Sequence, residues 1–223
     1  MKKRCLMISG GRLSLPFARD FLKGRSYECV IAVDAGFGAC LKLGLHPQLA
    51  VGDFDTFGRE RILCYQEDSG LSLDIHEPVK DETDTELAFF RAQQLGAGAV
   101  DVLGATGGRL DHEISNIHLL LQAKKRGLSA ALYDEQNKLY LLDAKEEPET
   151  EFTAGRVYGK YVSFLPLTET VRGITLTGFK YPLVEKDISI LENPSLCVSN
   201  ELAGERAVMR FREGILICVE SAD

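Results

Sequence analysis

Residues 30–56, VIAVDAGFGACLKLGLHPQLAVGDFDT, contain two short apolar runs on either side of a segment with helical periodicity. The runs Val30–Asp34 and Leu49–Val51 have the length and the composition of buried strands, and Gly38–Leu43 between them predicts a helix. A strand, a helix and a strand in this order predict two parallel strands of one sheet, joined by a crossover helix that packs on it.

The same alternation extends in both directions from this stretch, up to about residue 142. Further strands are expected at Cys5–Ser9, Leu73–His76, Ala99–Leu103 and Ala130–Tyr133. Further helices are expected at Leu15–Leu22, Asp84–Leu95 and Asp111–Arg126. The pattern therefore predicts an α/β domain, residues 1–143, with a mostly parallel twisted sheet covered by helices.

Two of the expected helices carry additional signals. Thr83-Asp84-Thr85-Glu86 fits a capping box, in which the first side chain accepts a hydrogen bond from an N–H group of the first helical turn. The later helix ends in Lys124-Lys125-Arg126-Gly127, cations followed by a stop signal. We expect its buried stripe to consist of Ile114, Ile117, His118 and Leu121, so that His118 is a packed side chain and not a ligand.

The character of the chain changes at the polar, acidic segment Asp143–Glu151, which is typical of a linker. The following residues are rich in short strand-like runs and glycines and contain no pattern typical of a helix. Ala207, Met209 and Phe211 alternate with Val208, Arg210 and Arg212, which is typical of a strand. Glu213-Gly214 is typical of a tight turn, and with Ile215–Val219 after it the pattern predicts a hairpin. We therefore expect a second, smaller all-β domain over residues 151–223, an antiparallel sandwich or a barrel-like fold, of which the sandwich is favoured.

Composition narrows the possible functions. The net charge of −7 argues against a nucleic-acid or anionic-membrane surface, since both require basic footprints. No apolar run approaches the roughly 20 residues of a membrane span, and MKKRCLMISGG reads as a first strand and not as a signal peptide. The 6 cysteines contain no Cys-x-x-Cys pair and lie mostly in apolar runs, which is typical of buried thiols in a reducing cytoplasm.

Aspartates recur where apolar runs end or helices begin. They are Asp34, Asp53, Asp55, Asp81, Asp84 and Asp111. In an open α/β sheet these segments converge on one edge, where two carboxylates about 5 Å apart repel each other by about 3 kcal/mol at an effective dielectric of about 20. Residues two apart on an extended segment share a side, and residues three apart share a helix face. Asp53 and Asp55 are two apart, and Asp81 and Asp84 are three apart. Together these two pairs favour a shared Mg²⁺ site over independent caps and turns, although each pair alone is weak evidence.

The loop from Gly104 to His112, GATGGRLDH, joins a strand to a helix through three glycines. Its backbone amides are suited to an anion, but for the loop alone a tight strand-to-helix turn is the favoured interpretation. No Walker A or dinucleotide fingerprint is present, so a phosphate bound here requires positive charge from Arg109 and Lys80. Ser9-Gly10-Gly11 is likewise open to two interpretations, a nucleotide contact or a turn.

In the second half, three residues are not needed by a simple strand pattern. Tyr181 offers a flat surface for a heteroaromatic ring, and Ser199 and Asn200 offer hydrogen bonds. The alternative, that all three are edge-strand and turn residues, is favoured by composition alone.

Taken together, the motifs resemble the thiamin pyrophosphokinase family, especially its bacterial members. The matching segments are VDAG (33–36), VGDFDT (51–56), KDETDTELA (80–88), GATGGRLDH (104–112), SFLPL (163–167), GITLTGFKYPL (173–183) and VSNE (198–201). They occur in the order of the family and cover nearly the whole chain, so the set is specific although each motif is weak.

The resemblance implies a nucleotide-binding α/β domain, a thiamin-binding β-sandwich and a homodimer in which thiamin lies between domains of different subunits. It implies Mg²⁺-dependent transfer of the diphosphate of ATP to the hydroxyl of thiamin, which gives thiamin diphosphate and AMP. The implied magnesium ligands are Asp53, Asp55 and Asp84, and the residues around the phosphates and thiamin are Lys80, Asp81, Arg109 and Asp111. The residues expected to bind ATP or thiamin are Asp34, Thr85, Arg109, Tyr181, Ser199 and Asn200. Animal and fungal members carry a tryptophan where this chain has Tyr181.

Three other classes of protein remain compatible with parts of the pattern. If the chain were an Asp-x-Asp sugar-nucleotide glycosyltransferase, Asp53 and Asp55 would bind its metal ion. The motif KDETDTE and the second domain would then have no explanation. A metal-dependent phosphohydrolase fits the carboxylates and releases inorganic phosphate without thiamin. A nucleotide-sensing module binds ATP without forming AMP.

Overall fold

The computed structural model describes residues 3–54, 57–75 and 82–223. The chain divides into two compact units, Met1–Glu135 and Gln136–Asp223. Within the described residues, no helix is long and apolar enough to cross a membrane.

The first unit alternates strands and helices along the chain. Its strands are β1 (Lys3–Ile8), β2 (Cys29–Val33), β3 (Leu49–Gly52), β4 (Ser72–Ile75), β5 (Ala97–Leu103) and β6 (Ser129–Tyr133). Its helices are α1 (Leu15–Leu22), α2 (Gly36–Leu43), α3 (Arg59–Ser69), α4 (Asp84–Gln94) and α5 (Leu110–Lys125). The expected α/β domain is therefore confirmed.

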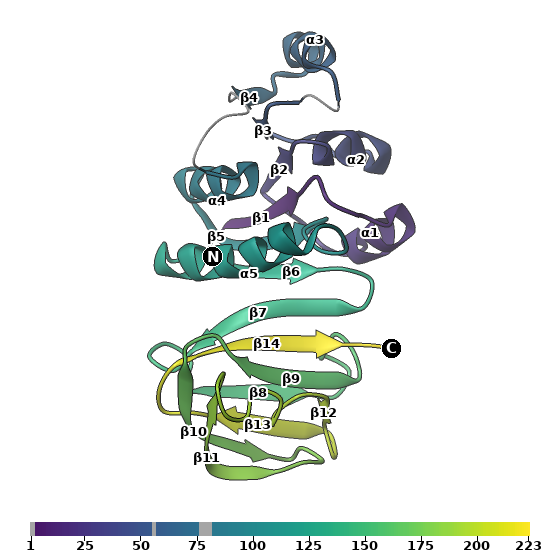
Figure 1. Ribbon diagram of the computed structural model, residues 1–223. Coiled ribbons are helices and arrows are strands. Elements are labelled where there is room, and N and C mark those ends of the chain that lie inside the picture. Colours follow the sequence, from purple (N-terminus) through teal and green to yellow (C-terminus); the bar gives the residue numbers. More distant parts are fainter. Residues whose placement is uncertain (1–2, 55–56, 76–81) are drawn as a thin grey trace. The chain divides into compact units, whose positions relative to one another are not determined.

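The strands of this unit lie in the order β6-β5-β1-β2-β3-β4, and all the described pairs are parallel. Helices cover both faces, with α1 and α2 on one side and α4 and α5 on the other (Figure 1). All five residues of β2 are buried, as expected for a strand covered on both faces. Strands β2, β3 and β4 follow one another on one side of β1, and β5 and β6 lie on its other side. The topological switch point, where ligands bind in such sheets, therefore lies between β1 and β5.

The buried face of α5 differs from the expected stripe. The buried residues are Asn116, Leu119, Leu120 and Ala123, whereas Ile114 and His118 are exposed. The prediction of a packed His118 is therefore wrong. The reason is a phase error, since the observed face follows the same i, i+3, i+4, i+7 spacing from a different starting residue.

The second unit consists of two antiparallel layers of strands. They are β7 (Asn137–Asp143), β8 (Glu149–Thr153), β9 (Tyr161–Pro166), β10 (Thr170–Thr177), β11 (Leu183–Ser189), β12 (Asn200–Glu201), β13 (Arg206–Arg210) and β14 (Ile215–Ser221). One layer has the order β12-β9-β14-β7 and the other β11-β10-β13-β8. The expected β-sandwich is confirmed, and the acidic segment 143–151 runs from the last residue of β7 into the first residues of β8 within this unit.

Three phenylalanines mark the centre of the sandwich. The rings of Phe152, Phe164 and Phe179 meet edge to face, with centroids 5.6 to 5.9 Å apart. The predicted hairpin between Ala207–Arg212 and Ile215–Val219 is wrong, because β13 pairs with β10 and β8 while β14 pairs with β7 and β9. Both strands turn alternate apolar residues toward the same core, so their sequence pattern does not distinguish a hairpin from a crossing between layers.

Candidate functional site

A cavity of about 780 Å³ lies at the switch point of the first unit. Residues from the ends of β1, β2, β3 and β5 and from the starts of α4 and α5 line it. Five of the residues predicted for the site line this cavity: Asp34, Asp53, Asp84, Thr85 and Arg109. The structure therefore brings together side chains that are far apart in the sequence.

Three carboxylates meet at one side of the cavity. Asp34 shares a hydrogen bond with Asp84, and the backbone N–H of Asp53 donates to the Asp34 carboxyl group. Burial, followed by the charges of Asp84 and Asp53, raises the pKa of Asp34 to about 7. Among the described residues, Asp34 Oδ1 is a buried oxygen with no hydrogen-bond partner. This corner of the cavity thus gathers three carboxyl groups, and one buried oxygen among them has no hydrogen-bond partner in the described part of the chain.

The backbone around these carboxylates is tightly constrained. Asp34 has φ 48° and Phe54, next to Asp53, has φ 58°, both in the left-handed region that disfavours side chains. The Asp34 N–H donates to Val51 O at 3.0 Å, which ties the end of β2 to the end of β3. A Cβ atom on Gly52 would lie only 1.9 Å from Asp34 Oδ1, so only glycine permits this carboxylate position.

The start of α4 is fixed in the way the capping box predicts. Thr83 is the N-cap residue, and its Oγ1 accepts from the N–H of Glu86 at 3.2 Å. Thr85 in the first turn is buried, and its hydroxyl lies 3.2 Å from that of Ser9 at the end of β1. The helix terminus that carries Asp84 is therefore held against the strand beside the cavity.

The glycine loop after β5 packs directly on the turn after β1. The N–H of Gly11 donates to Gly104 O at 2.9 Å, and a Cβ on Gly11 would lie 2.5 Å from that oxygen. Thr106 Oγ1 donates to Asp134 at 2.7 Å, and the N–H of Gly108 donates to Glu113 at 2.6 Å. The loop is thus a rigid wall of the cavity.

Arg109 and Asp111 form an exposed pair at the start of α5. The guanidinium donates two hydrogen bonds to the carboxylate, of 3.1 and 2.6 Å. The bond to Arg109 lowers the pKa of Asp111, although burial opposes the shift. Arg109 lines the cavity, whereas Asp111 is not among the described residues that do.

Three of the predicted site residues lie outside the described residues: Asp55, Lys80 and Asp81. Within residues 3–54, 57–75 and 82–223, no group of three or more His, Cys, Asp or Glu side chains is arranged to hold a metal ion. The described donors still fit a hard cation, because they are carboxylate oxygens, one of which is buried without a partner.

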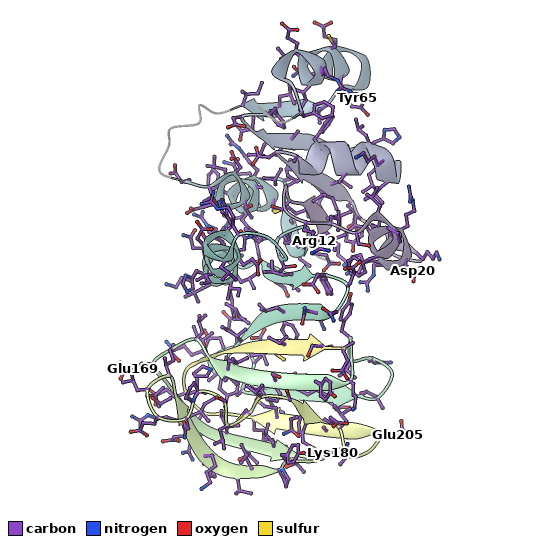
Figure 2. All side chains as sticks on the ribbon, turned by 45° about the vertical axis from the view of Figure 1, so that its right-hand side comes forward. Arg12, Asp20, Tyr65, Glu169, Lys180 and Glu205 are labelled. Carbon is purple, nitrogen blue, oxygen red and sulfur yellow. The ribbon has the colours of Figure 1, made fainter. Side chains whose placement is uncertain are left out.

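Asn200 and Tyr181 are joined in the second unit. Asn200 is 2% exposed; its Oδ1 accepts from the N–H of Tyr181 at 3.0 Å, and its Nδ2 donates to Tyr181 O at 2.9 Å. Backbone hydrogen bonds pair residues 178–180 with residues 201–203; for example, Lys180, labelled in Figure 2, donates its N–H to Glu201 O at 2.8 Å. The Asn200 amide extends this pairing by one residue. The Tyr181 side chain is 65% exposed, so the amide holds the backbone of an aromatic residue that faces solvent.

Ser199 has φ 56°, and its N–H donates to Ser163 Oγ at 2.9 Å. Sequence reasoning did not identify Ser163, which is buried on β9. It likewise did not assign Thr106, Glu113 and Asn116, which line the cavity. The glycine-rich loop and the helix start were the available signals for these three residues, since both elements were predicted at the correct place.

Two family models match the chain. They are described as thiamin pyrophosphokinase, catalytic domain, which matches residues 23–132, and thiamin pyrophosphokinase, vitamin B1 binding domain, which matches residues 144–216. The thiamine pyrophosphokinase of Bacillus subtilis (strain 168) is 36% identical over 197 residues, which are 86% of this chain and 87% of that protein.

Solved structures agree with this similarity. A thiamine pyrophosphokinase crystal structure from Bacillus subtilis matches with a TM-score of 0.84 and 32% identity, over 99% of this chain and 100% of that one. A thiamin pyrophosphokinase structure from Geobacillus thermodenitrificans matches with a TM-score of 0.81 and 34% identity, over 99% and 98% of the two chains. Similarity therefore extends through both units.

Proposed function

The chain belongs to the thiamin pyrophosphokinase family, and we propose that the cavity of its first unit is the place of reaction. Its activity is the transfer of the diphosphate of ATP to the hydroxyl group of thiamin, which gives thiamin diphosphate and AMP. The observation that carries the proposed placement is the meeting of Asp34, Asp53 and Asp84 in one cavity at the switch point of the sheet.

We propose that Asp53, Asp55 and Asp84 hold Mg²⁺, with Asp34 beside them. Support comes from Asp34 Oδ1, which has no hydrogen-bond partner among the described residues, and from the pKa of this carboxyl group, which burial and the charges of Asp84 and Asp53 raise. Mg²⁺ bound there would supply neutralisation of charge on the phosphate oxygens of ATP.

The walls of the cavity are suited to a polyphosphate chain. The N-terminus of α4 presents backbone N–H groups, and the glycines after β1 and β5 allow an anion to approach the backbone closely. We propose that Arg109 and Lys80 stabilise charge on the transferring group or on the departing AMP. The hydrogen bonds from Arg109 to Asp111 would then fix the direction of the guanidinium.

Catalysis by these residues is mainly alignment and charge neutralisation. A primary alcohol is a weak nucleophile, and the β-phosphorus of ATP is shielded by negative oxygens. Asp111 is a poor proton acceptor, because Arg109 lowers its pKa. A loose, dissociative transition state needs little proton removal from the alcohol before transfer, so the reaction does not depend on a strong base. Asp81, the other residue considered for orienting the alcohol, lies outside the described residues.

We further propose that the second unit supplies the thiamin pocket. Tyr181 would stack on a ring of thiamin and Ser199 would hydrogen-bond it, with Asn200 holding Tyr181 in place. The proposed assembly is a homodimer in which thiamin lies between the first unit of one subunit and the second unit of its partner. The proposed location is the cytoplasm, which is consistent with six free cysteines.

Product analysis with ATP, Mg²⁺ and thiamin tests the assignment. Chromatography should show thiamin diphosphate and AMP in equal amounts, and no AMP above background when thiamin is omitted. ADP or inorganic phosphate as the main product would contradict the proposal and favour a phosphohydrolase or another transferase. An Asp84→Asn variant is expected to lose at least about 100-fold in turnover, because it removes a charge that positions the cation.

A further inference from the structure

Arg12, labelled in Figure 2, lies immediately after the Ser9-Gly10-Gly11 turn that leaves β1. Its side chain is exposed, and within the described ranges it makes no hydrogen bond, ion pair or ring contact. Among the residues that the structure describes, Arg109 is the only lysine or arginine lining the cavity, and its guanidinium is bonded to Asp111. Arg12 is therefore an uncommitted guanidinium next to a lining segment.

The stem of Arg12 lies over the glycine loop after β5. A Cβ atom added to Gly107 would lie 3.5 Å from both Cβ and Cδ of Arg12, so the Arg12 side chain faces the side of Gly107 on which a side chain would stand. The loop residues on either side, Thr106 and Gly108, line the cavity, as does Gly11. The base of the Arg12 side chain is thus placed between two cavity-lining segments.

Both of these segments are held in fixed positions. The 2.9 Å hydrogen bond from Gly11 to Gly104 locks the two turns together, and the 2.7 Å bond from Thr106 to Asp134 fixes the loop from the other side. A guanidinium on such a support loses less conformational freedom on binding than one on a mobile loop. Its planar fork of N–H donors matches phosphate oxygens.

The charge of the cavity creates a need for such a group. Besides Asp34, Asp53 and Asp84, the carboxylates of Glu82 and Glu113 line it. A nucleoside triphosphate adds about four negative charges, counting a second ionisation near pH 6 on its terminal phosphate. Cationic side chains beside the cavity therefore decide how tightly the nucleotide binds.

We propose that the Arg12 guanidinium binds a phosphate group of the nucleotide at the rim of this cavity. The inference rests on the proposed placement of the reaction in the first unit, and it adds a binding residue from the β1 turn to those expected from the sequence. It assigns to Arg12 a role in nucleotide affinity and none in binding thiamin.

Titration calorimetry with ATP and Mg²⁺ on wild type, Arg12→Ala and Arg12→Lys tests this role. We expect Arg12→Ala to raise the Kd for ATP by about tenfold, in line with the loss of one charge-assisted hydrogen bond, and Arg12→Lys to recover part of that loss. The KM for thiamin and the melting temperature should stay at wild-type values. Arg19→Ala is the matched control, because it removes an exposed arginine on α1 that bonds to Lys42 O, and it should bind ATP like wild type.

Three results would overturn the inference. An unchanged Kd for ATP in Arg12→Ala would show that the guanidinium does not contact the nucleotide. A lowered melting temperature, with both KM values raised and no recovery in Arg12→Lys, would assign Arg12 a purely structural role. If the wild-type protein does not bind ATP, the proposed site itself is wrong, and the role of Arg12 with it. The first two results, in contrast, contradict only the role of Arg12.

Discussion

Asp34 combines two unfavourable features at the end of β2. Its backbone is in the left-handed region, and one of its carboxylate oxygens is buried without a partner among the described residues. Gly52 leaves the space that this oxygen occupies. Strain and uncompensated charge of this kind persist when the surrounding structure imposes them, and they are concentrated at functional sites.

The raised pKa of Asp34 predicts how pH affects stability. The folded pKa of about 7 lies above the ordinary aspartate value, so the folded state binds the proton more tightly than the unfolded state. The contribution of this proton to the free energy of unfolding is fully present below the pKa that Asp34 has in the unfolded state. It is lost as pH rises through about 7. In metal-free buffer, the melting temperature of Asp34→Asn should therefore exceed that of wild type by more at about pH 8.5 than at about pH 5.5.

Asp20→Asn provides the control for this measurement, because the Asp20 side chain is 75% exposed and, within the described part of the chain, forms an ion pair with Lys23 alone. Its melting temperature should follow wild type across the same range. Parallel curves for wild type and Asp34→Asn would contradict the account of this carboxyl group.

The location of Asp34 at a strand end was predictable from VIAVDAG, but the absence of a partner for its Oδ1 among the described residues was not. The position of this oxygen depends on Gly52, Asp53 and Asp84, which lie on two segments, the end of β3 with the residue after it and the start of α4. The sequence pattern places such residues at one edge of the sheet but does not determine which atoms face each other there.

At the scale of elements, backbone hydrogen bonds pair residues 178–180 with residues 201–203, and this pairing is extended to Tyr181 by the side chain of Asn200. Its amide continues a backbone ladder, so it acts on Tyr181 through the main chain. If Tyr181 contacts thiamin, Asn200→Ala should raise the KM for thiamin by about tenfold and leave the Kd for ATP unchanged, because a mispositioned ring loses its stacking energy.

A double-mutant cycle identifies whether Asn200 acts through Tyr181. The KM for thiamin of the double variant Asn200→Ala/Tyr181→Ala should be close to that of Tyr181→Ala alone, since the two residues form one unit. Additive effects of the two substitutions would instead assign Asn200 a contact with thiamin that is independent of the ring.

The predicted elements differ in accuracy for identifiable physical reasons. The helix Leu15–Leu22 was predicted with its exact bounds, because Ser14 caps it and Pro16 lies in its first turn. No helix was predicted at α3, whose sequence RERILCYQEDS has Ile62 as a fully buried residue but no clear apolar stripe. The order of strands within the two layers of the second unit was not predictable, since alternation reports which side chains are buried and not which strands pair.

At the scale of the whole molecule, the proposed assembly predicts complementation between two inactive variants. Asp84→Asn damages the first unit, and Ser199→Ala/Asn200→Ala damages the second. If each active site uses both subunits, an equimolar mixture after subunit exchange should regain about one quarter of wild-type activity, because half of the dimers are mixed and each has one intact site. The measurement is thiamin diphosphate formation, with each variant alone as the control.

Complementation also separates two architectures. A mixture that stays inactive, although native mass spectrometry shows mixed dimers, would indicate that each site is built within one subunit. A mass equal to one chain at working concentration would contradict the dimer itself.

The central claim is that Asp34, Asp53 and Asp84 form the protein's side of a site for a divalent cation with bound nucleotide. Anomalous diffraction from crystals grown with Mn²⁺ and ATP tests it most directly, because Mn²⁺ accepts the same oxygen ligands as Mg²⁺ and is located by its own signal. The account predicts an anomalous peak within coordination distance of the Asp53 and Asp84 carboxylates, beside Asp34. A peak elsewhere, with these carboxylates bonded to protein groups or facing solvent, would contradict it.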